Sequence, residues 1–147
     1  MRTKVFLDTN TLVDIAVERQ GAAASQVVLS LVKRHMLEAQ VSTQSLIDMS
    51  YIAHRYGTPA EKVEALIREI YRYVNIGYID SSSIKWALEH STGDFEDDAQ
   101  YDCASSWGCD YFLTRDKAIL ARAEKANVMK AVTPEDFVSS MVTQETE

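Results

Sequence analysis

Two aspartates in this 147-residue chain follow apolar runs that could place them at one chemical site. Asp8 comes directly after Val5-Phe6-Leu7, and Asp116 comes shortly after a second run that ends in Leu113-Thr114. Each pattern is typical of a buried strand that ends at an acid. In an open α/β sheet, ligands bind in the crevice at the carboxyl ends of the strands. We therefore expect Asp8 and Asp116 to point into one crevice.

Two further acids, Asp48 and Asp97, lie near the starts of predicted helices that could abut the same crevice. Four carboxylates meeting there would repel one another, so a cation must offset them. Carboxylates and water select a hard ion such as Mg²⁺ or Mn²⁺. A site for a softer metal is not predicted, because His35, His54 and His90 are scattered and the chain contains no Cys-x-x-Cys.

A carboxylate-held Mg²⁺ can activate water and stabilise the charge that develops on a phosphate, which is phosphodiester hydrolysis without a protein nucleophile. This chemistry also addresses the net charge of −7, which is unusual for a protein that binds nucleic acid through its own cations. The ion supplies positive charge at the phosphate. Arg115 and Lys117, which flank Asp116, are candidates for contacting the substrate phosphate.

The remaining acids have ordinary structural interpretations. The run Asp94-Phe95-Glu96-Asp97-Asp98, with Asp102 after it, is typical of a solvated helix face, which competes with a metal role for each acid in it. Three polar residues are interpreted either as helix caps and strand-end hydrogen bonders or as supports for the acids: Asn10, Ser42 and Thr114. Five aspartates are interpreted as surface, cap or turn residues: Asp14, Asp80, Asp102, Asp110 and Asp136.

Strand-like and helical segments alternate along the chain. Strands are predicted at 3–7, 39–42, 75–79, 110–114 and, weakly, 128–132, and helices between them include 22–37, 43–56 and 60–74. This alternation predicts an α/β fold with a parallel sheet, helices on both faces and right-handed crossovers. We expect one domain over residues 1–142 and a loose tail over 143–147.

Composition agrees with a globular protein, at 46% hydrophobic and 25% charged residues. No apolar run approaches the roughly 20 residues that a membrane span requires, and the run before Asp8 is too short for a signal peptide. We therefore expect a cytoplasmic protein with no membrane association. Cys103 and Cys109 are expected to be free thiols in a reducing compartment.

Five stretches of the sequence occur in an order that is specific in combination. They are Phe6-Leu7-Asp8-Thr9-Asn10, Val41-Ser42 six residues before Asp48, Asp94-Phe95-Glu96-Asp97 with Gln100-Tyr101, Leu113-Thr114-Arg115-Asp116, and Thr133-Pro134-Glu135-Asp136-Phe137. Together they resemble the PIN-domain family and, within it, the VapC-like toxins of bacterial toxin–antitoxin pairs.

The resemblance implies a three-layer α/β sandwich and a Mg²⁺- or Mn²⁺-dependent endoribonuclease, a homodimer neutralised by an antitoxin protein, acting on an RNA such as tRNA or rRNA. It assigns Asp8, Asp97 and Asp116 to the metal. Asp48 falls where many members of the family have Glu, and we expect it to bind that ion, to bind a second ion or to position a water. The resemblance assigns Asn10, Ser42 and Thr114 to the polar surroundings of these acids. The chain departs from the family pattern at Asp98, where a small apolar residue is usual, and at Ile119-Leu120, where relatives often carry Asp-Phe.

Other functions remain open from the sequence. A stand-alone RNA-processing nuclease or a non-catalytic PIN-like module that binds protein fits the same fold. A phosphatase of the haloacid-dehalogenase type would use Asp8 as its nucleophile, but it normally needs a second aspartate where this chain has Asn10.

Overall fold

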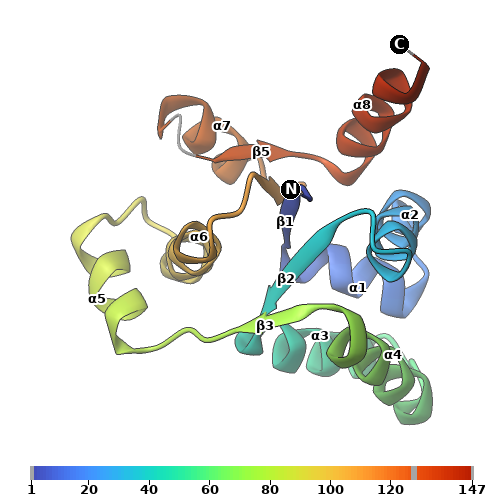
Figure 1. Ribbon diagram of the computed structural model, residues 1–147. Coiled ribbons are helices and arrows are strands. Elements are labelled where there is room, and N and C mark those ends of the chain that lie inside the picture. The colour runs from blue at the N-terminus through green and yellow to red at the C-terminus, as the bar shows by residue number, and fades with distance from the viewer. Residues whose placement is uncertain (1, 127–128, 147) are drawn as a thin grey trace.

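The computed structural model describes residues 2–126 and 129–146, in which strands and helices alternate around one sheet (Figure 1). The strands are β1 (Lys4–Leu7), β2 (Glu38–Ser42), β3 (Asn75–Gly77), β4 (Tyr111–Leu113) and β5 (Lys130–Val132). The helices are α1 (Thr9–Val17), α2 (Ala22–Lys33), α3 (Thr43–Arg55), α4 (Ala60–Tyr73), α5 (Ser81–Glu89), α6 (Phe95–Trp107), α7 (Lys117–Ala126) and α8 (Pro134–Thr146).

The sheet has the order β3-β2-β1-β4-β5, and all of its strand pairs are parallel. β1 is the central strand, with Phe6 opposite Gln40 of β2 and Phe112 of β4. Val5 and Phe6 are fully buried. A parallel strand covered on both faces is a continuous apolar run, which is why Val5-Phe6-Leu7 was recognisable in the sequence. The predicted α/β fold with a central parallel sheet is confirmed.

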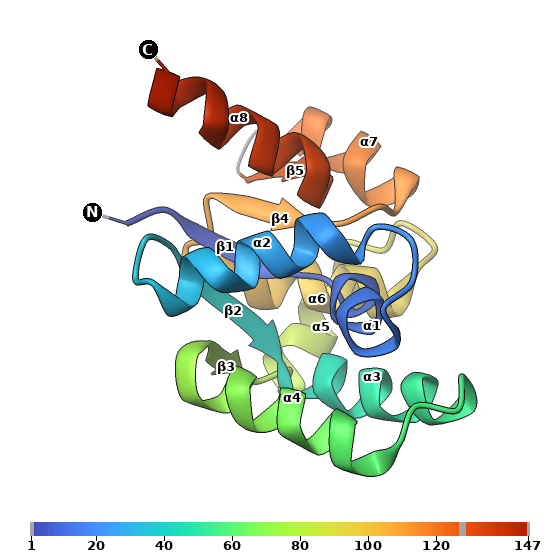
Figure 2. The ribbon, with the colours of Figure 1, turned by 90° about the vertical axis from the view of Figure 1, so that its right-hand side faces the viewer.

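Alternation along β1 divides the interior into two cores. Val5 and Leu7 belong to the core under α1, α2, α3, α4 and α8, whereas Phe6 belongs to the core under α5, α6 and α7. Figures 1 and 2 show these two helical layers on opposite faces of the sheet. In the second core, Phe6 stacks on Phe112 with ring centroids 4.9 Å apart. The molecule is therefore the predicted three-layer sandwich.

Two helix ends differ from the sequence prediction by more than one residue. α2 ends at Lys33 and not at 37, because His35 adopts a left-handed φ of 60° and the Met36 N–H returns to the Leu31 carbonyl at 2.9 Å. α8 continues to Thr146, so residues 143–146 are helical where a loose tail was expected. Of the predicted strand at 128–132, residue 128 lies outside the described residues and β5 occupies 130–132.

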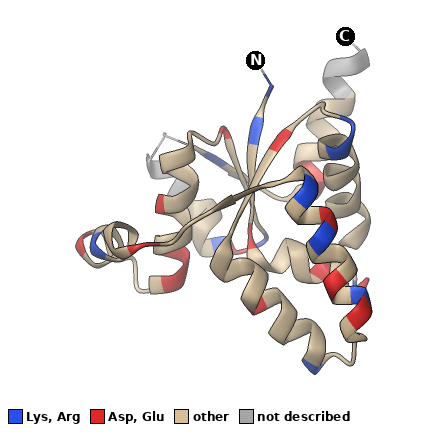
Figure 3. Cartoon of the chain, turned by 60° about the horizontal axis from the view of Figure 1, so that its bottom comes forward, with Lys and Arg blue, Asp and Glu red and all other residues tan. Residues whose placement is uncertain are grey.

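Both cysteines are free, as predicted, and both are buried. Burial raises the pKa of Cys103 to about 11 and that of Cys109 to about 12. None of the described helices has the length and apolar character needed to cross a membrane. Figure 3 shows Lys and Arg distributed over helices on different sides of the molecule, with Asp and Glu between them.

Candidate active site: an acidic pocket at the carboxyl edge of the sheet

The carboxyl ends of β1 and β4 are neighbours in the sheet, and the acids that follow them share one pocket. This pocket has a volume of about 390 Å³. Six carboxylates line it: Asp8, Asp48, Asp94, Glu96, Asp97 and Asp116. The structure thus brings all four predicted acids together and adds two more from the acidic run. No Lys or Arg among the described residues lines this pocket.

Asp8 is almost completely buried and is held from two sides. Its Oδ1 accepts the Thr9 N–H at 2.8 Å, which makes Asp8 the N-cap of α1, and its Oδ2 accepts the Thr114 hydroxyl at 2.8 Å. Burial raises the pKa of Asp8 against the opposing effect of these two hydrogen bonds, and the charges of Asp116 and Asp94 raise it further. The protein alone therefore stabilises the charged form of Asp8 poorly.

The first turn of α6 supplies three of the six acids. Asp94 is the N-cap, and its Oδ1 accepts the Asp97 N–H at 3.1 Å. Burial raises the pKa of Asp97 to about 8, with further contributions from the charges of Asp94, Asp116 and Asp8. Burial also raises the pKa of Glu96, together with the charges of Asp48, Asp8 and Asp94. The spacing of Asp94 and Asp97, one helical turn apart, is the signal that could have added Asp94 to the predicted site.

Asp116 and Asp48 complete the wall of the pocket from two other elements. Asp116 leads into α7, where its Oδ1 accepts the N–H of Ala118 at 2.8 Å and that of Ile119 at 3.3 Å. Asp48 lies on α3 and accepts the Gln44 side-chain amide at 2.9 Å. Each acid is thus oriented by its own helix while its carboxylate remains in the pocket lining.

The donor set suits a hard divalent cation. All the charged atoms of the lining are carboxylate oxygens, the ligands that Mg²⁺ and Mn²⁺ prefer, and the raised pKa values of Asp8, Glu96 and Asp97 indicate negative charge that a cation would balance. Within residues 2–126 and 129–146, no three acidic, histidine or cysteine side chains already converge at metal-ligand distances. An ion held by three of these side chains would require the carboxylates to rotate toward it.

A larger cavity of about 660 Å³ lies at the opposite, amino edge of the sheet, between Arg2, Lys4, Glu38, Gly108 and Asp110. Its acidic and basic side chains are balanced in number, and Asp110 is occupied in accepting the Lys4 N–H at 2.9 Å. This larger cavity therefore does not gather charges of one sign, as the smaller, acidic pocket does.

The family model of the PIN domain matches residues 4–118, which include all six acids of the pocket. The chain belongs to the PIN-domain family. The haloacid-dehalogenase alternative is therefore wrong. No protein of curated function matches the sequence.

Two solved structures share the fold of this PIN domain. VapC20 of Mycobacterium tuberculosis, described as a toxin that cleaves the sarcin–ricin loop, has a TM-score of 0.62 and 12% identity, over 80% of this chain and 94% of that chain. VapBC2 of Rickettsia felis, bound to a DNA fragment from their promoter, has a TM-score of 0.63 and 13% identity, over 89% of this chain and 98% of that chain. At these identities the similarity concerns the fold.

A buried hydrogen-bonded cluster lies behind the acids of this PIN domain. Ser42 caps α3 by accepting the Ser45 N–H at 2.9 Å, and its hydroxyl donates to Ser45 Oγ at 3.0 Å. Ser45 Oγ also accepts the Gln100 side-chain amide at 2.8 Å and lies 2.8 Å from Thr9 Oγ1. The cluster joins α1, α3 and α6, the helices that carry Asp8, Asp48 and Asp97. Of its members, the sequence analysis assigned only Ser42.

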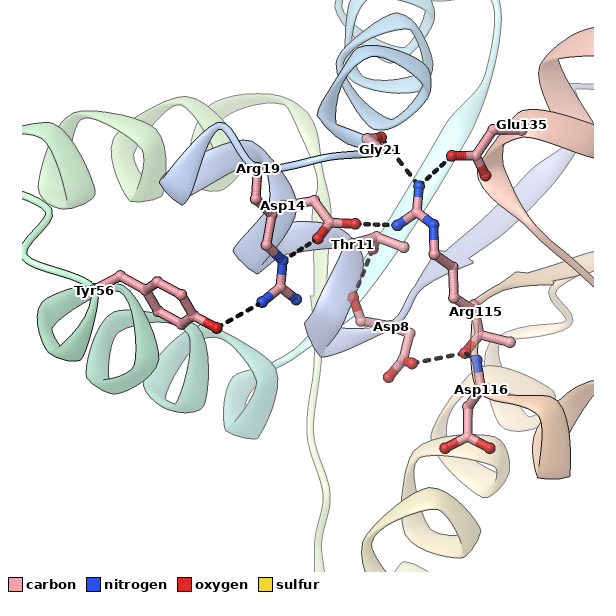
Figure 4. A network of polar contacts seen from close by, with 10 residues as sticks. Asp8, Thr11, Asp14, Arg19, Gly21, Tyr56, Arg115, Asp116 and Glu135 are labelled. Carbon is pink, nitrogen blue, oxygen red and sulfur yellow. Dashed lines mark hydrogen bonds and ion pairs between the residues drawn. The ribbon is translucent and has the colours of Figure 1, made fainter.

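Arg115 of the PIN domain is engaged elsewhere than in the pocket (Figure 4). Its guanidinium donates to Asp14 and Glu135 and to the Gly21 carbonyl, the last at 3.1 Å. Figure 4 shows Arg115 directed toward these partners and Asp116 directed away from them. Arg115 is therefore paired with protein carboxylates and is not part of the pocket lining, and its contact with a substrate phosphate stays a prediction.

Asp14 and Asp98 are the acids whose sequence interpretation was wrong. Asp14, expected at a surface, cap or turn, is buried and paired with both Arg19 and Arg115. Asp98, expected on a solvated face, is fully buried and accepts the Thr92 N–H at 3.0 Å and the Thr92 hydroxyl at 2.7 Å. In both cases a buried carboxylate is compensated by donors that lie on another segment.

Proposed function

We propose that this PIN domain is a divalent-metal-dependent endoribonuclease. The observation that carries the proposal is the gathering of six carboxylates, from four separate segments, around one pocket at the carboxyl edge of the sheet. The pKa of about 8 for Asp97 indicates that the protein does not balance this charge by itself. A site of carboxylates with an oxygen-seeking cation is suited to phosphodiester hydrolysis.

Asp8, Asp97 and Asp116 would hold the ion, and Asp48 would bind it, bind a second ion or position a water. When bound, Mg²⁺ or Mn²⁺ activates water as the nucleophile and offsets the charge of the scissile phosphate. Thr114 maintains the orientation of Asp8 through its 2.8 Å hydrogen bond. Since ligand carboxylates bind well only when their orientation is fixed, this hydroxyl supports the site without contacting substrate.

Two exposed residues, one in the pocket lining and one beside Asp116 in the sequence, are assigned to the substrate. Asn10 lines the pocket on the first turn of α1, where its side-chain amide can bond a ribose hydroxyl or a phosphate oxygen. Lys117 is exposed at the first position of α7, beside Asp116, where its ammonium can contact a substrate phosphate. Ser42 acts from behind the acids, through Ser45.

We further propose that the nuclease is the toxin of a toxin–antitoxin pair, a cytoplasmic homodimer neutralised by an antitoxin protein. The support is the similarity to VapC20, a toxin that cleaves the sarcin–ricin loop, and to VapBC2. A structured RNA such as tRNA or rRNA is the corresponding substrate class.

The test is incubation of the purified chain with tRNAs and rRNA fragments in Mg²⁺, in Mn²⁺ or in EDTA. Wild type is expected to cut at discrete positions only with a divalent metal, and Asp8→Asn and Asp97→Asn are expected not to cut. Thermal unfolding of both variants controls for loss of the fold. Cutting that persists in EDTA contradicts the proposal. Absence of cutting together with absence of Mg²⁺ and Mn²⁺ binding in calorimetry favours a non-catalytic protein-binding module instead.

A further inference from the structure

The lining of the acidic pocket includes an aromatic ring. Tyr51 on α3 contributes to the lining and is 63% exposed, so most of its ring is available to a ligand. It lies three residues after Asp48, which places both side chains on one face of the helix. A ring that is largely in water contributes little to the core, and its position beside six carboxylates indicates a role in the pocket.

Arg55 extends this face of α3 by one further turn. Its guanidinium carbon lies 5.9 Å from the centroid of the Tyr51 ring. Among the side chains that the structure describes, Arg55 has no carboxylate within ion-pair distance, whereas Arg19 and Arg115 are both paired with Asp14. Arg55 is therefore a cation that remains available to an external anion.

We propose that Tyr51 and Arg55 form a nucleotide subsite next to the acids. The Tyr51 ring stacks on an unpaired base that flanks the scissile phosphate, and the Arg55 guanidinium contacts a neighbouring phosphate of the same strand. The subsite rests on the proposed nuclease function, since it places single-stranded RNA across the acidic pocket.

The chemistry of the face matches this ligand. Aromatic side chains stack on bases of any sequence, and arginine supplies the positive charge that tracks the phosphate backbone. A chain of net charge −7 has few places that attract RNA, and this face combines a ring and an available cation beside the acids. The competing occupant is a protein, because Ile47 on the same helix is 65% exposed. RNA is favoured because Tyr51 lines the pocket itself and Arg55 lies beside its ring.

The subsite is tested by anisotropy with a short fluorescein-labelled single-stranded RNA in Mg²⁺, with every protein carrying Asp97→Asn to prevent cutting. Tyr51→Ala is expected to weaken binding about 5- to 150-fold, the range that base–aromatic stacking gives. Tyr51→Phe retains the ring and is expected to bind within about twofold of its parent. Tyr71→Ala on α4, where Tyr71 is 77% exposed, is the matched control and is expected to bind normally.

An abasic scan of the RNA identifies the stacked base. One abasic position is expected to weaken binding to the protein with Tyr51 intact and to have no effect on the Tyr51→Ala protein, since the two changes remove one interaction. If every abasic position acts equally on both proteins, the stacking assignment is overturned.

Arg55→Gln is expected to reduce the slope of log binding constant against log salt by about 0.7, the value for one contact with a single-strand phosphate. Arg72→Gln is the control, because Arg72 also lies over a tyrosine ring, 5.2 Å from the Tyr73 centroid, but on α4. Equal slopes for Arg55→Gln and its parent overturn the phosphate contact.

The remaining outcomes separate the subsite from the nuclease function. If wild type cuts RNA and Tyr51→Ala cuts and binds RNA equally well, the subsite is wrong and the nuclease function stands. If Tyr51→Ala and Ile47→Ser change the mass in light scattering without changing RNA binding, the face is a protein interface and the subsite is overturned. If neither wild type nor the Asp97→Asn parent binds RNA, both proposals fail.

Discussion

Asp97 and Asp98 are adjacent on α6, but their carboxylates lie in different surroundings. Asp97 is half-buried among the acids of the pocket, whereas Asp98 is fully buried and accepts two hydrogen bonds from Thr92. Successive helix residues point about 100° apart, so an acidic run divides between two environments. The sequence predicted a site acid in this run. It did not show that Thr92 would donate hydrogen bonds to Asp98, and the burial of Asp98 was therefore not predicted.

At the residue scale, we predict that Asp97→Asn alters the pH dependence of stability in EDTA. The pKa of Asp97 is raised from 3.8 to about 8, so the folded protein holds this proton more tightly than the unfolded chain does. The stabilising contribution is complete below about pH 4 and is lost as the pH rises toward 8. The variant has no carboxyl group at position 97, so its stability does not fall for this reason as the pH rises. Relative to wild type it is therefore expected to gain unfolding temperature between pH 5 and pH 8.

Circular dichroism across this pH range measures the effect, with the exposed Asp136→Asn as the control for loss of one surface charge. A difference in unfolding temperature that stays constant from pH 5 to pH 8 would show that burial and the charges of the neighbouring acids do not raise the pKa of Asp97.

At the element scale, a network of ion pairs and one hydrogen bond joins α1 and α8 to the connections that follow α1, α3 and β4. Arg115, after β4, pairs with Asp14 on α1 and with Glu135 on α8, and Asp14 also pairs with Arg19. Arg19 in turn donates to the Tyr56 hydroxyl after α3, at 3.4 Å. The network holds the segment that carries Asp116 against the helix that begins after Asp8.

The strand ends that carry Asp8 and Asp116 were predictable from the sequence, because a buried parallel strand is a local apolar signal. The Asp14–Arg115 pair was not predictable in this way, because its members are 101 residues apart. The contact of Ser45 with Gln100 spans 55 residues and was missed for the same reason. Local patterns predict elements and their ends, whereas long-range side-chain partners depend on how the elements pack.

We predict that Asp14→Asn lowers the free energy of unfolding by about 1–3 kcal/mol, because it leaves two arginines without their shared carboxylate. The loss is smaller than for a fully buried pair, since both arginine side chains are about a third exposed and water can solvate them. Glu135→Gln, at a carboxylate that is 48% exposed, is expected to cost at most about 1 kcal/mol. Urea unfolding measures the free energy of unfolding of both variants. An equal loss in the two would show that Asp14 stabilises the network no more than Glu135 does.

At the scale of the whole molecule, the site exists only when the chain is folded. Its acids come from the end of β1, from α3, from the first turn of α6 and from the connection after β4. A cation that these acids hold binds the native state and not the unfolded chain, so it must stabilise the fold.

We therefore predict that Mg²⁺ raises the unfolding temperature of wild type relative to EDTA at equal ionic strength. At a hundredfold excess over the dissociation constant, binding contributes about 2.7 kcal/mol. Asp97→Asn is expected to lose most of this gain and Asp136→Asn to keep it, as measured by scanning calorimetry. An equal Mg²⁺ effect on all three proteins would place the ion elsewhere.

The most direct measurement of the central claim is the rate of RNA cutting as a function of Mg²⁺ concentration, for wild type, Asp97→Asn and Asp136→Asn. If the acidic pocket is the active site, the wild-type cutting rate rises with Mg²⁺ concentration and vanishes in EDTA. A loss on the order of 100-fold or more is expected in Asp97→Asn, because the variant lacks a ligand of the ion that stabilises transition-state charge, and no loss is expected in Asp136→Asn. An Asp97→Asn protein that is folded and cuts at the wild-type rate would contradict the assignment.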